Sequence, residues 1–207
     1  MSESKSERKV AVIFATDVVD YSTMMEKNED QTLKNLKSCR NIIEDLIKEY
    51  HGRIFNTAGD SVLAEFQSAV EAVICASEFQ KTIKERNNSV GEEEQMQFRV
   101  GINFGDVVIE GENLYGEGVN VAARLESLAQ PGGICLSRNV HEIVNKKTDF
   151  EFHDLGEQKV KNTVLHAIDV LIDPSHKRII QPKSSSRMPF YAGIITVLLI
   201  GLGSIFY

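Results

Sequence analysis

Two aspartates, Asp17 and Asp60, stand where strands are predicted to end, and their carboxylates could hold a metal ion. Asp17 follows an apolar run from Val10 to Ala15, which is typical of a strand buried on both faces. A charge at the end of such a strand is costly unless it is paired or binds a cation. Ser22 follows as a predicted helix N-cap, so the free N–H groups of the helix could face a phosphate. The alternative is that both aspartates only stabilise turns.

A second polar pair, Asn120 and Arg124, lies four residues apart in a helix predicted over 119–129, so the two side chains share one helix face. Most of their neighbours in that helix are apolar. An amide and a guanidinium on such a helix could donate hydrogen bonds to an oxyanion that develops during a reaction. The alternative is a solvated arginine beside a helix-capping asparagine.

Hydrophobic periodicity predicts the elements that would position these side chains. Helical spacing continues from Ser22 to about Tyr50, and short strands on both sides of Gly59 predict a β-hairpin. A second strand pair is predicted to turn at Gly105. The fold class is therefore α+β, with helices over a largely antiparallel sheet built on a ferredoxin-like core. Strands are predicted at 10–15, 53–57, 62–66, 96–104, 107–110, 134–136, 150–152 and 164–172, helices at 22–50, 69–83, 119–129 and 139–144, and a Gly-rich loop at 111–118.

Composition excludes several function classes. The net charge is -7 and no basic stripe is present, so nucleic acid is not an expected partner. The three cysteines, Cys39, Cys75 and Cys135, are far apart and have no zinc-ligand spacing, so neither a zinc site nor a disulfide framework is predicted. The sequence divides into a disordered leader over 1–8, a globular domain over 9–173, a polar Pro/Ser linker over 174–187 and an apolar segment over 188–207.

The apolar segment, from Pro189 to Tyr207, contains no charge and is long enough to cross a hydrocarbon core of about 30 Å as a helix. Aromatic residues lie near both of its ends, and the lysines and arginines before it would stay on the cytoplasmic side. We therefore expect one transmembrane helix over 188–207, in the inner or plasma membrane, with the preceding domain in the cytoplasm. A buried core helix is the alternative, and the polar linker disfavours it.

Six motifs then make the chemistry more specific, and they occur in a fixed order. They are FAxDVVxYS, GDSVLAEF, FRVGINxGDV, LYGxGVNVAARLE, PGGICLS and LGEQKVKN. Together they resemble the catalytic domain of the class III adenylyl/guanylyl cyclases in its bacterial form. The resemblance covers about Lys9 to Ile172. It implies that the domain over 9–173 is a nucleotide cyclase catalytic domain.

The resemblance also implies roles for particular residues. Asp17, Asp60 and the backbone of Val18 match the ligands of two metal ions per site, Mg²⁺ or Mn²⁺. Arg99 matches a residue that contacts the triphosphate, and Lys161 matches a second phosphate-binding residue. Metal ions at this position would acidify a ribose hydroxyl and hold the leaving phosphates, so no strong general base is needed.

Asn120 and Arg124 match the pair that orients the ribose and stabilises the transition state. Members of this family act as head-to-tail dimers with their sites at the interface. The resemblance therefore implies a homodimer in which Asp17 and Asp60 come from one subunit, and Asn120, Arg124 and Lys161 from the other.

The nucleotide base is read at two positions of the family, which here are Asn56 and Asn113. Adenylyl cyclases usually carry Lys at the first and Asp or Thr at the second, and guanylyl cyclases usually carry Glu and Cys. An amide is both donor and acceptor and suits either base. The absence of the guanine-selecting acid favours ATP, so the expected function is an adenylate cyclase that makes cyclic AMP. The alternatives are a guanylate or dual-specificity cyclase, and a non-catalytic module for dimerisation or nucleotide sensing.

Overall fold

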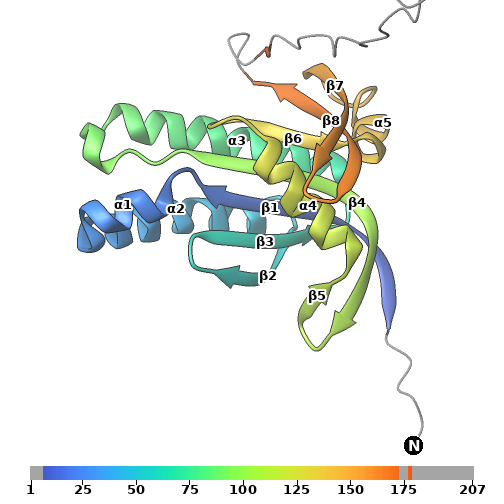
Figure 1. Cartoon of the computed structure of the whole chain (residues 1–207), viewed down its shortest axis with the longest axis horizontal. Coiled ribbons are helices and arrows are strands. Elements are labelled where there is room, and N and C mark those ends of the chain that lie inside the picture. The colour runs from blue at the N-terminus through green and yellow to red at the C-terminus, as the bar shows by residue number, and fades with distance from the viewer. Residues whose placement is uncertain (1–6, 173–176, 179–207) are drawn as a thin grey trace, which may run out of the picture.

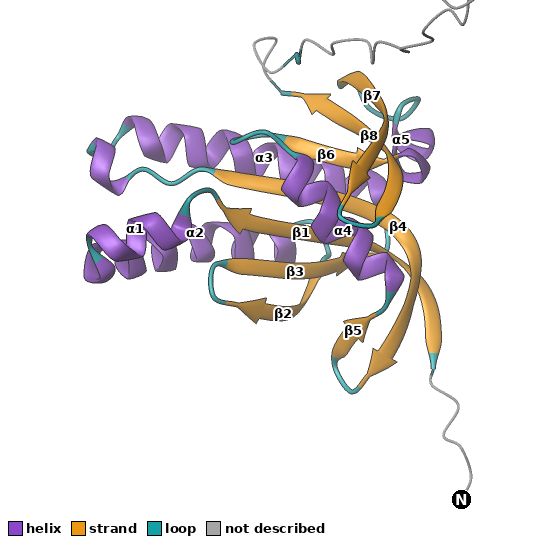
Figure 2. Ribbon diagram, in the orientation of Figure 1, coloured by secondary structure: helices purple, strands orange, loops and turns teal. Residues whose placement is uncertain are grey.

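A single mixed sheet forms the centre of the protein, as seen in a computed structural model that describes residues 7–172 and 177–178 (Figure 1, Figure 2). The strands are β1 (Arg8–Val18), β2 (Arg53–Ala58), β3 (Ser61–Phe66), β4 (Phe98–Glu110), β5 (Asn113–Tyr115), β6 (Ile134–Ser137), β7 (Glu151–Val160) and β8 (Thr163–Leu171). The helices are α1 (Tyr21–Lys27), α2 (Glu29–Glu49), α3 (Ala69–Asn88), the short 3-10 helix η1 (Glu92–Glu94), α4 (Glu117–Leu128) and α5 (Arg138–Val144).

The strand order is β2-β3-β1-β4-β6-β8-β7, and β5 pairs with β4 outside this path. The first four strands are antiparallel to one another and are connected as in a ferredoxin-like core. The predicted α+β fold is thus confirmed in its main part. The pair β4–β6 is parallel, so the sheet as a whole is mixed rather than antiparallel.

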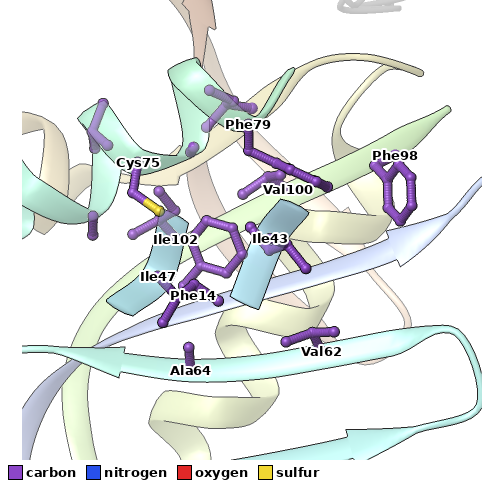
Figure 3. Close-up of a cluster of buried hydrophobic side chains, with 14 of the residues drawn as sticks. Phe14, Ile43, Ile47, Val62, Ala64, Cys75, Phe79, Phe98, Val100 and Ile102 are labelled. Atoms are coloured by element: carbon purple, nitrogen blue, oxygen red, sulfur yellow. The ribbon is translucent and has the colours of Figure 1, made fainter. Parts of the chain in front are cut away.

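Helices cover both faces of β1, which explains its apolar run. Val12 and Phe14 pack with α2 and α3 in the larger core, as Figure 3 shows for Phe14. Ile13, whose side chain points to the other face, packs with Ala122 of α4. Because side chains alternate along a strand, both faces of β1 need apolar residues. The strand ends at Val18, so Asp17 lies at the edge of the two apolar clusters that cover the faces of β1.

The strand pair predicted around Gly105 is wrong. Strand β4 continues through Gly105, because β1 pairs with it along its whole length, with Arg8 opposite Val108 at one end and Val18 opposite Phe98 at the other. The chain turns instead after β4, where Gly111 has φ 60. It returns as β5, so the predicted Gly-rich loop contains a short strand.

The long helix predicted from Ser22 is two helices. Asn28 interrupts it with an extended backbone, and its side chain accepts a hydrogen bond from the N–H of Gln31 at 3.1 Å, which makes it the N-cap of α2. Helix α1 begins at Tyr21, directly after Asp20, whose φ of 55 is left-handed. Ser22 therefore lies inside α1 and is not an N-cap.

The globular domain begins one residue earlier than predicted. Strand β1 begins at Arg8, so the last residue of the predicted leader belongs to the sheet. Across residues 7–172 and 177–178, no helix has the length and apolar character needed to cross a bilayer. The transmembrane helix predicted over 188–207 lies outside the described residues.

Candidate active site

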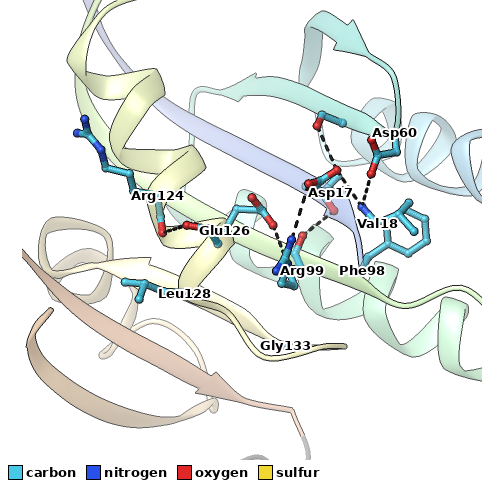
Figure 4. Close-up of polar contacts among 12 residues, drawn as sticks. Asp17, Val18, Asp60, Phe98, Arg99, Arg124, Glu126, Leu128 and Gly133 are labelled. Atoms are coloured by element: carbon cyan, nitrogen blue, oxygen red, sulfur yellow. Dashed lines mark hydrogen bonds and ion pairs between the residues drawn. The ribbon is translucent and has the colours of Figure 1, made fainter. Parts of the chain in front are cut away.

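The structure brings Asp17 and Asp60 together at the end of β1. The backbone N–H of Val18 donates to both carboxylates, at 3.0 Å to Asp17 Oδ1 and 3.2 Å to Asp60 Oδ2. The hydroxyl of Ser61 also donates to Asp17 Oδ1, at 3.2 Å. Figure 4 shows these contacts in one group. They arise because β3, which follows the turn containing Asp60, is the direct neighbour of β1 in the sheet.

The electrostatics of this acidic pair suit a divalent cation. Partial burial and the neighbouring carboxylate of Asp17 raise the pKa of Asp60 to about 6. Two adjacent carboxylates repel each other, and a bound cation would remove that cost. Among the described residues, no group of three or more His, Cys, Asp or Glu side chains is arranged to hold a metal ion. The site therefore offers two carboxylates, which fits Mg²⁺ or Mn²⁺ completed by substrate phosphates and water.

Arg99 on β4 places a positive charge beside the acidic pair. Its guanidinium lies 3.8 Å from Asp17 Oδ2. Its Nε is 2.9 Å from Oε1 of Glu126 on α4, although the two atoms are not aligned as a hydrogen bond. The hydroxyl of Thr16 donates to the backbone carbonyl of Arg99 at 2.8 Å and so ties β4 to β1 at this point.

Glu126 is a residue that the sequence analysis missed. Its pKa is raised to about 7, mainly by burial; the charge of Arg99 opposes this rise, and the charges of Asp17 and Asp60 add to it. The signal was present, because Glu126 follows the buried Ala122 by four residues and therefore lies on the inward face of α4. An acid on that face needs a cationic partner, and Arg99 supplies it.

The position of α4 is set by Gly101 on β4. A Cβ at Gly101 would lie 2.1 Å from the backbone N of Glu126 and 2.2 Å from the carbonyl O of Ala122, so only glycine allows the helix to pack this closely. The helix then presents Asn120 to solvent and leaves Arg124 half-buried. Figure 4 shows the guanidinium of Arg124 pointing away from the acidic pair.

Within one chain, the predicted metal ligands with Arg99 and the predicted transition-state residues thus form two separate groups. The first contains the acidic pair and Arg99 at the end of β1. The second contains Asn120 and Arg124 on the outer side of α4. Lys161 is exposed at the turn between β7 and β8, with φ 53.

The structure brings the two predicted base-reading residues into contact. Asn56 on β2 donates from its amide nitrogen to Oδ1 of Asn113 on β5, at 3.3 Å. The residues are far apart in the sequence, and both are half-buried. Their contact forms a small amide surface that can donate and accept hydrogen bonds.

Comparison with known proteins identifies the family of this chain. Residues 2–172 match the family model described as the adenylate and guanylate cyclase catalytic domain. A provisionally named adenylate cyclase 3 of Rhizobium meliloti is 40% identical over 190 residues, which is 91% of this chain and 31% of that protein. This chain therefore spans about a third of the length of that relative.

Solved structures show the same fold. An adenylate/guanylate cyclase/hydrolase from Silicibacter pomeroyi is 40% identical, with a TM-score of 0.74 over 80% of this chain and 98% of that one. The adenylyl cyclase CyaB from P. aeruginosa is 23% identical, with a TM-score of 0.70 over 86% of this chain and 100% of that one. From its motifs, its fold and these matches, this chain belongs to the class III adenylyl/guanylyl cyclase catalytic domain family.

Proposed function

We propose that this chain is an adenylate cyclase that converts ATP to 3′,5′-cyclic AMP and pyrophosphate at sites shared between two copies of the chain. The separation of the two residue groups within one chain carries this proposal. Asp17, Asp60 and Arg99 can hold metal ions and phosphates, but Arg124 points away from them. A head-to-tail dimer would place Asn120 and Arg124 of one copy over the acidic pair of the other.

In the proposed reaction, the ribose 3′-oxygen forms a bond to the α-phosphorus of the same nucleotide and releases its proton to solvent water. The bond from the α-phosphorus to the bridging oxygen breaks, and pyrophosphate leaves with the electron pair. Bound divalent ions would acidify the hydroxyl and neutralise charge on the phosphates. The protein's own task is then positioning and charge stabilisation.

Each residue has a defined part in that task. Asp17, Asp60 and the backbone of Val18 would hold the ions, and Arg99 together with Lys161 would bind the triphosphate. The partner's copy of α4 orients the ribose through its amide and stabilises the charge that develops on the α-phosphate through its guanidinium.

The preference for ATP rests on the Asn56–Asn113 contact. A guanine base offers N–H groups that a carboxylate accepts best, and neither position carries one. The Rhizobium meliloti relative is named as an adenylate cyclase, which supports the same choice. The Silicibacter pomeroyi structure is described by both activities, so guanylate cyclase remains the second candidate.

Product analysis of the purified full chain tests this function. The chain is incubated with ATP or GTP and Mn²⁺, and cyclic nucleotides are separated and identified. We expect cyclic AMP in excess of cyclic GMP. Cyclic GMP alone would favour the guanylate alternative, and no cyclic nucleotide from either substrate would favour a non-catalytic module.

The same assay tests the base-reading pair. The double variant Asn56→Glu with Asn113→Cys is expected to raise the ratio of GTP to ATP turnover about tenfold, because a glutamate accepts from the guanine N–H edge. Asn41→Glu adds the same charge at an exposed position of α2 and should leave the ratio unchanged. An unchanged ratio in the double variant would show that these residues do not read the base.

We also propose that residues 188–207 span the membrane once, on the strength of their charge-free apolar sequence. Recovery of the full chain in the membrane fraction, together with release of a chain ending at Arg187, would support this. Full recovery of the intact chain in the soluble fraction would contradict it.

A further inference from the structure

Arg178, beyond the end of β8, makes three hydrogen bonds back to the catalytic domain. Its guanidinium donates to both carboxylate oxygens of Asp169, at 2.6 and 2.8 Å, and to the backbone carbonyl of Leu128 at 2.7 Å. Asp169 lies on β8, and Leu128 is the last residue of α4. One side chain from the predicted linker therefore joins the sheet and the helix that carries Arg124.

Asp169, which accepts two of these hydrogen bonds, is an unusual residue at its position in β8. Asp169 is 5% exposed and interrupts a buried stretch of β8 that includes Ile168 and Val170. Burial raises the pKa of Asp169, and the guanidinium of Arg178 opposes that rise. A buried carboxylate is tolerated when it has a bidentate cationic partner, and no other described residue forms a bidentate pair with it.

The third hydrogen bond reaches the carboxyl end of α4. The last carbonyls of a helix have no partner within the helix, and a cation there also interacts favourably with the helix dipole. Leu128 follows Arg124 by four residues, which is about one helical turn. Arg178 therefore restrains α4 one turn from the proposed transition-state residue.

We propose that Arg178 is a positioning residue for the cyclase reaction, which fixes the carboxyl end of α4 and thereby the place of Arg124 and Asn120 in the shared site. This inference rests on the proposed function. Displacement of Arg178 would remove its hydrogen bond to the carboxyl end of α4, while the packing of the helix on Gly101 would remain. Arg178 acts through the helix and belongs to neither of the two site groups.

The kinetic test uses the full chain with Arg178→Gln. We expect kcat for ATP to fall about tenfold while KM changes less than about twofold, because a displaced Arg124 weakens transition-state contacts more than substrate binding. Lys177→Gln removes the neighbouring charge from an exposed position and should behave as the parent chain. Arg178→Lys keeps a charge near Asp169 but loses the bidentate geometry, so an intermediate kcat is expected.

A double-mutant cycle tests the pairing itself. Asp169→Asn removes the carboxylate that holds Arg178, so it should lower kcat as Arg178→Gln does. The two changes together should lower kcat no more than either change alone, because both remove the same Arg178–Asp169 interaction. Additive losses would overturn the inference, since they would mean that the two residues act separately.

Hydrogen–deuterium exchange supplies a readout that does not need activity. In Arg178→Gln, peptides covering Glu117–Leu128 should exchange faster, while peptides of α2 should not change. If α4 exchange and kcat both match the parent, the inference is wrong. If the parent chain turns over no nucleotide, the proposed function is wrong, and the exchange of α4 still decides whether Arg178 holds the helix.

Discussion

Replacing Asp17 with alanine is expected to lower cyclic nucleotide production by roughly 10²–10³-fold or more, the scale at which a preorganised electrostatic contact matters. Asp17 is one of only two carboxylates in the proposed metal site, and the structure offers no third acidic ligand among its described residues. Asp60 alone would bind two cations too weakly to compete with their hydration by water. The measurement is the initial rate of cyclic AMP formation with saturating Mg²⁺ or Mn²⁺.

The same variant should stay folded, which separates a lost site from a lost structure. Burial, and after it the adjacent carboxylate of Asp17, raises the pKa of Asp60 to about 6. Above that pH both carboxylates are charged in the native chain, and their repulsion costs stability in the absence of metal. Removing Asp17 relieves that repulsion. The melting temperature at pH 8 in a chelator should therefore equal or exceed that of the parent.

Two comparisons make the result specific. Asp17→Asn keeps an acceptor for Ser61 and tests the charge alone, and it should be nearly as inactive. Asp45→Ala, at an exposed position of α2, should retain full activity. Substantial turnover by Asp17→Ala at ordinary metal concentrations would show that the carboxylate is not a metal ligand.

Sequence patterns predicted those parts of the fold that depend on local periodicity. The buried strand β1 was visible because both of its faces contact helices, so its apolar run has no polar alternation. The hairpin of β2 and β3 was visible because its turn contains Gly59 between two short runs with β-branched and aromatic residues. Helix α4 was visible from its spacing; it begins two residues before the predicted start and ends one residue before the predicted end.

Other parts of the fold depend on contacts between distant residues, and local patterns misread them. Gly105 looks like a turn, yet its backbone stays extended because Ala11 of β1 pairs with it. Asn28 looks like a helix-interior residue, yet it caps α2. Arg178 looks like part of a polar linker, because nothing nearby in the sequence points to the buried Asp169.

In the candidate site, too, some features follow from local sequence patterns and others from contacts between distant residues. The proximity of Asp17 and Asp60 could be expected, since each ends or follows a strand of the central sheet. Glu126 was missed because a single acid in a helix usually faces solvent, and its partner Arg99 lies on another element. The sequence motifs placed the residues in the family, whereas the structure is needed to see that they fall into two groups.

The central claim is that each active site takes its metal ligands from one chain and its transition-state residues from the other. Asp17→Ala and Arg124→Ala test it together, because each should be inactive alone for a different reason. In a heterodimer of the two variants, one site carries both lesions and the other carries neither. Verified subunit exchange between the two purified variants is the necessary control.

The decisive measurement is the cyclase activity of that mixture. Random pairing makes about half of the dimers heterodimers, each with one intact site of two, so roughly a quarter of wild-type activity should return. A mixture of two separately prepared samples of Asp17→Ala should recover none. Activity near a quarter supports the shared site, and an inactive mixture after proven exchange would contradict it, because Asp17 and Arg124 would then serve the same chain's site.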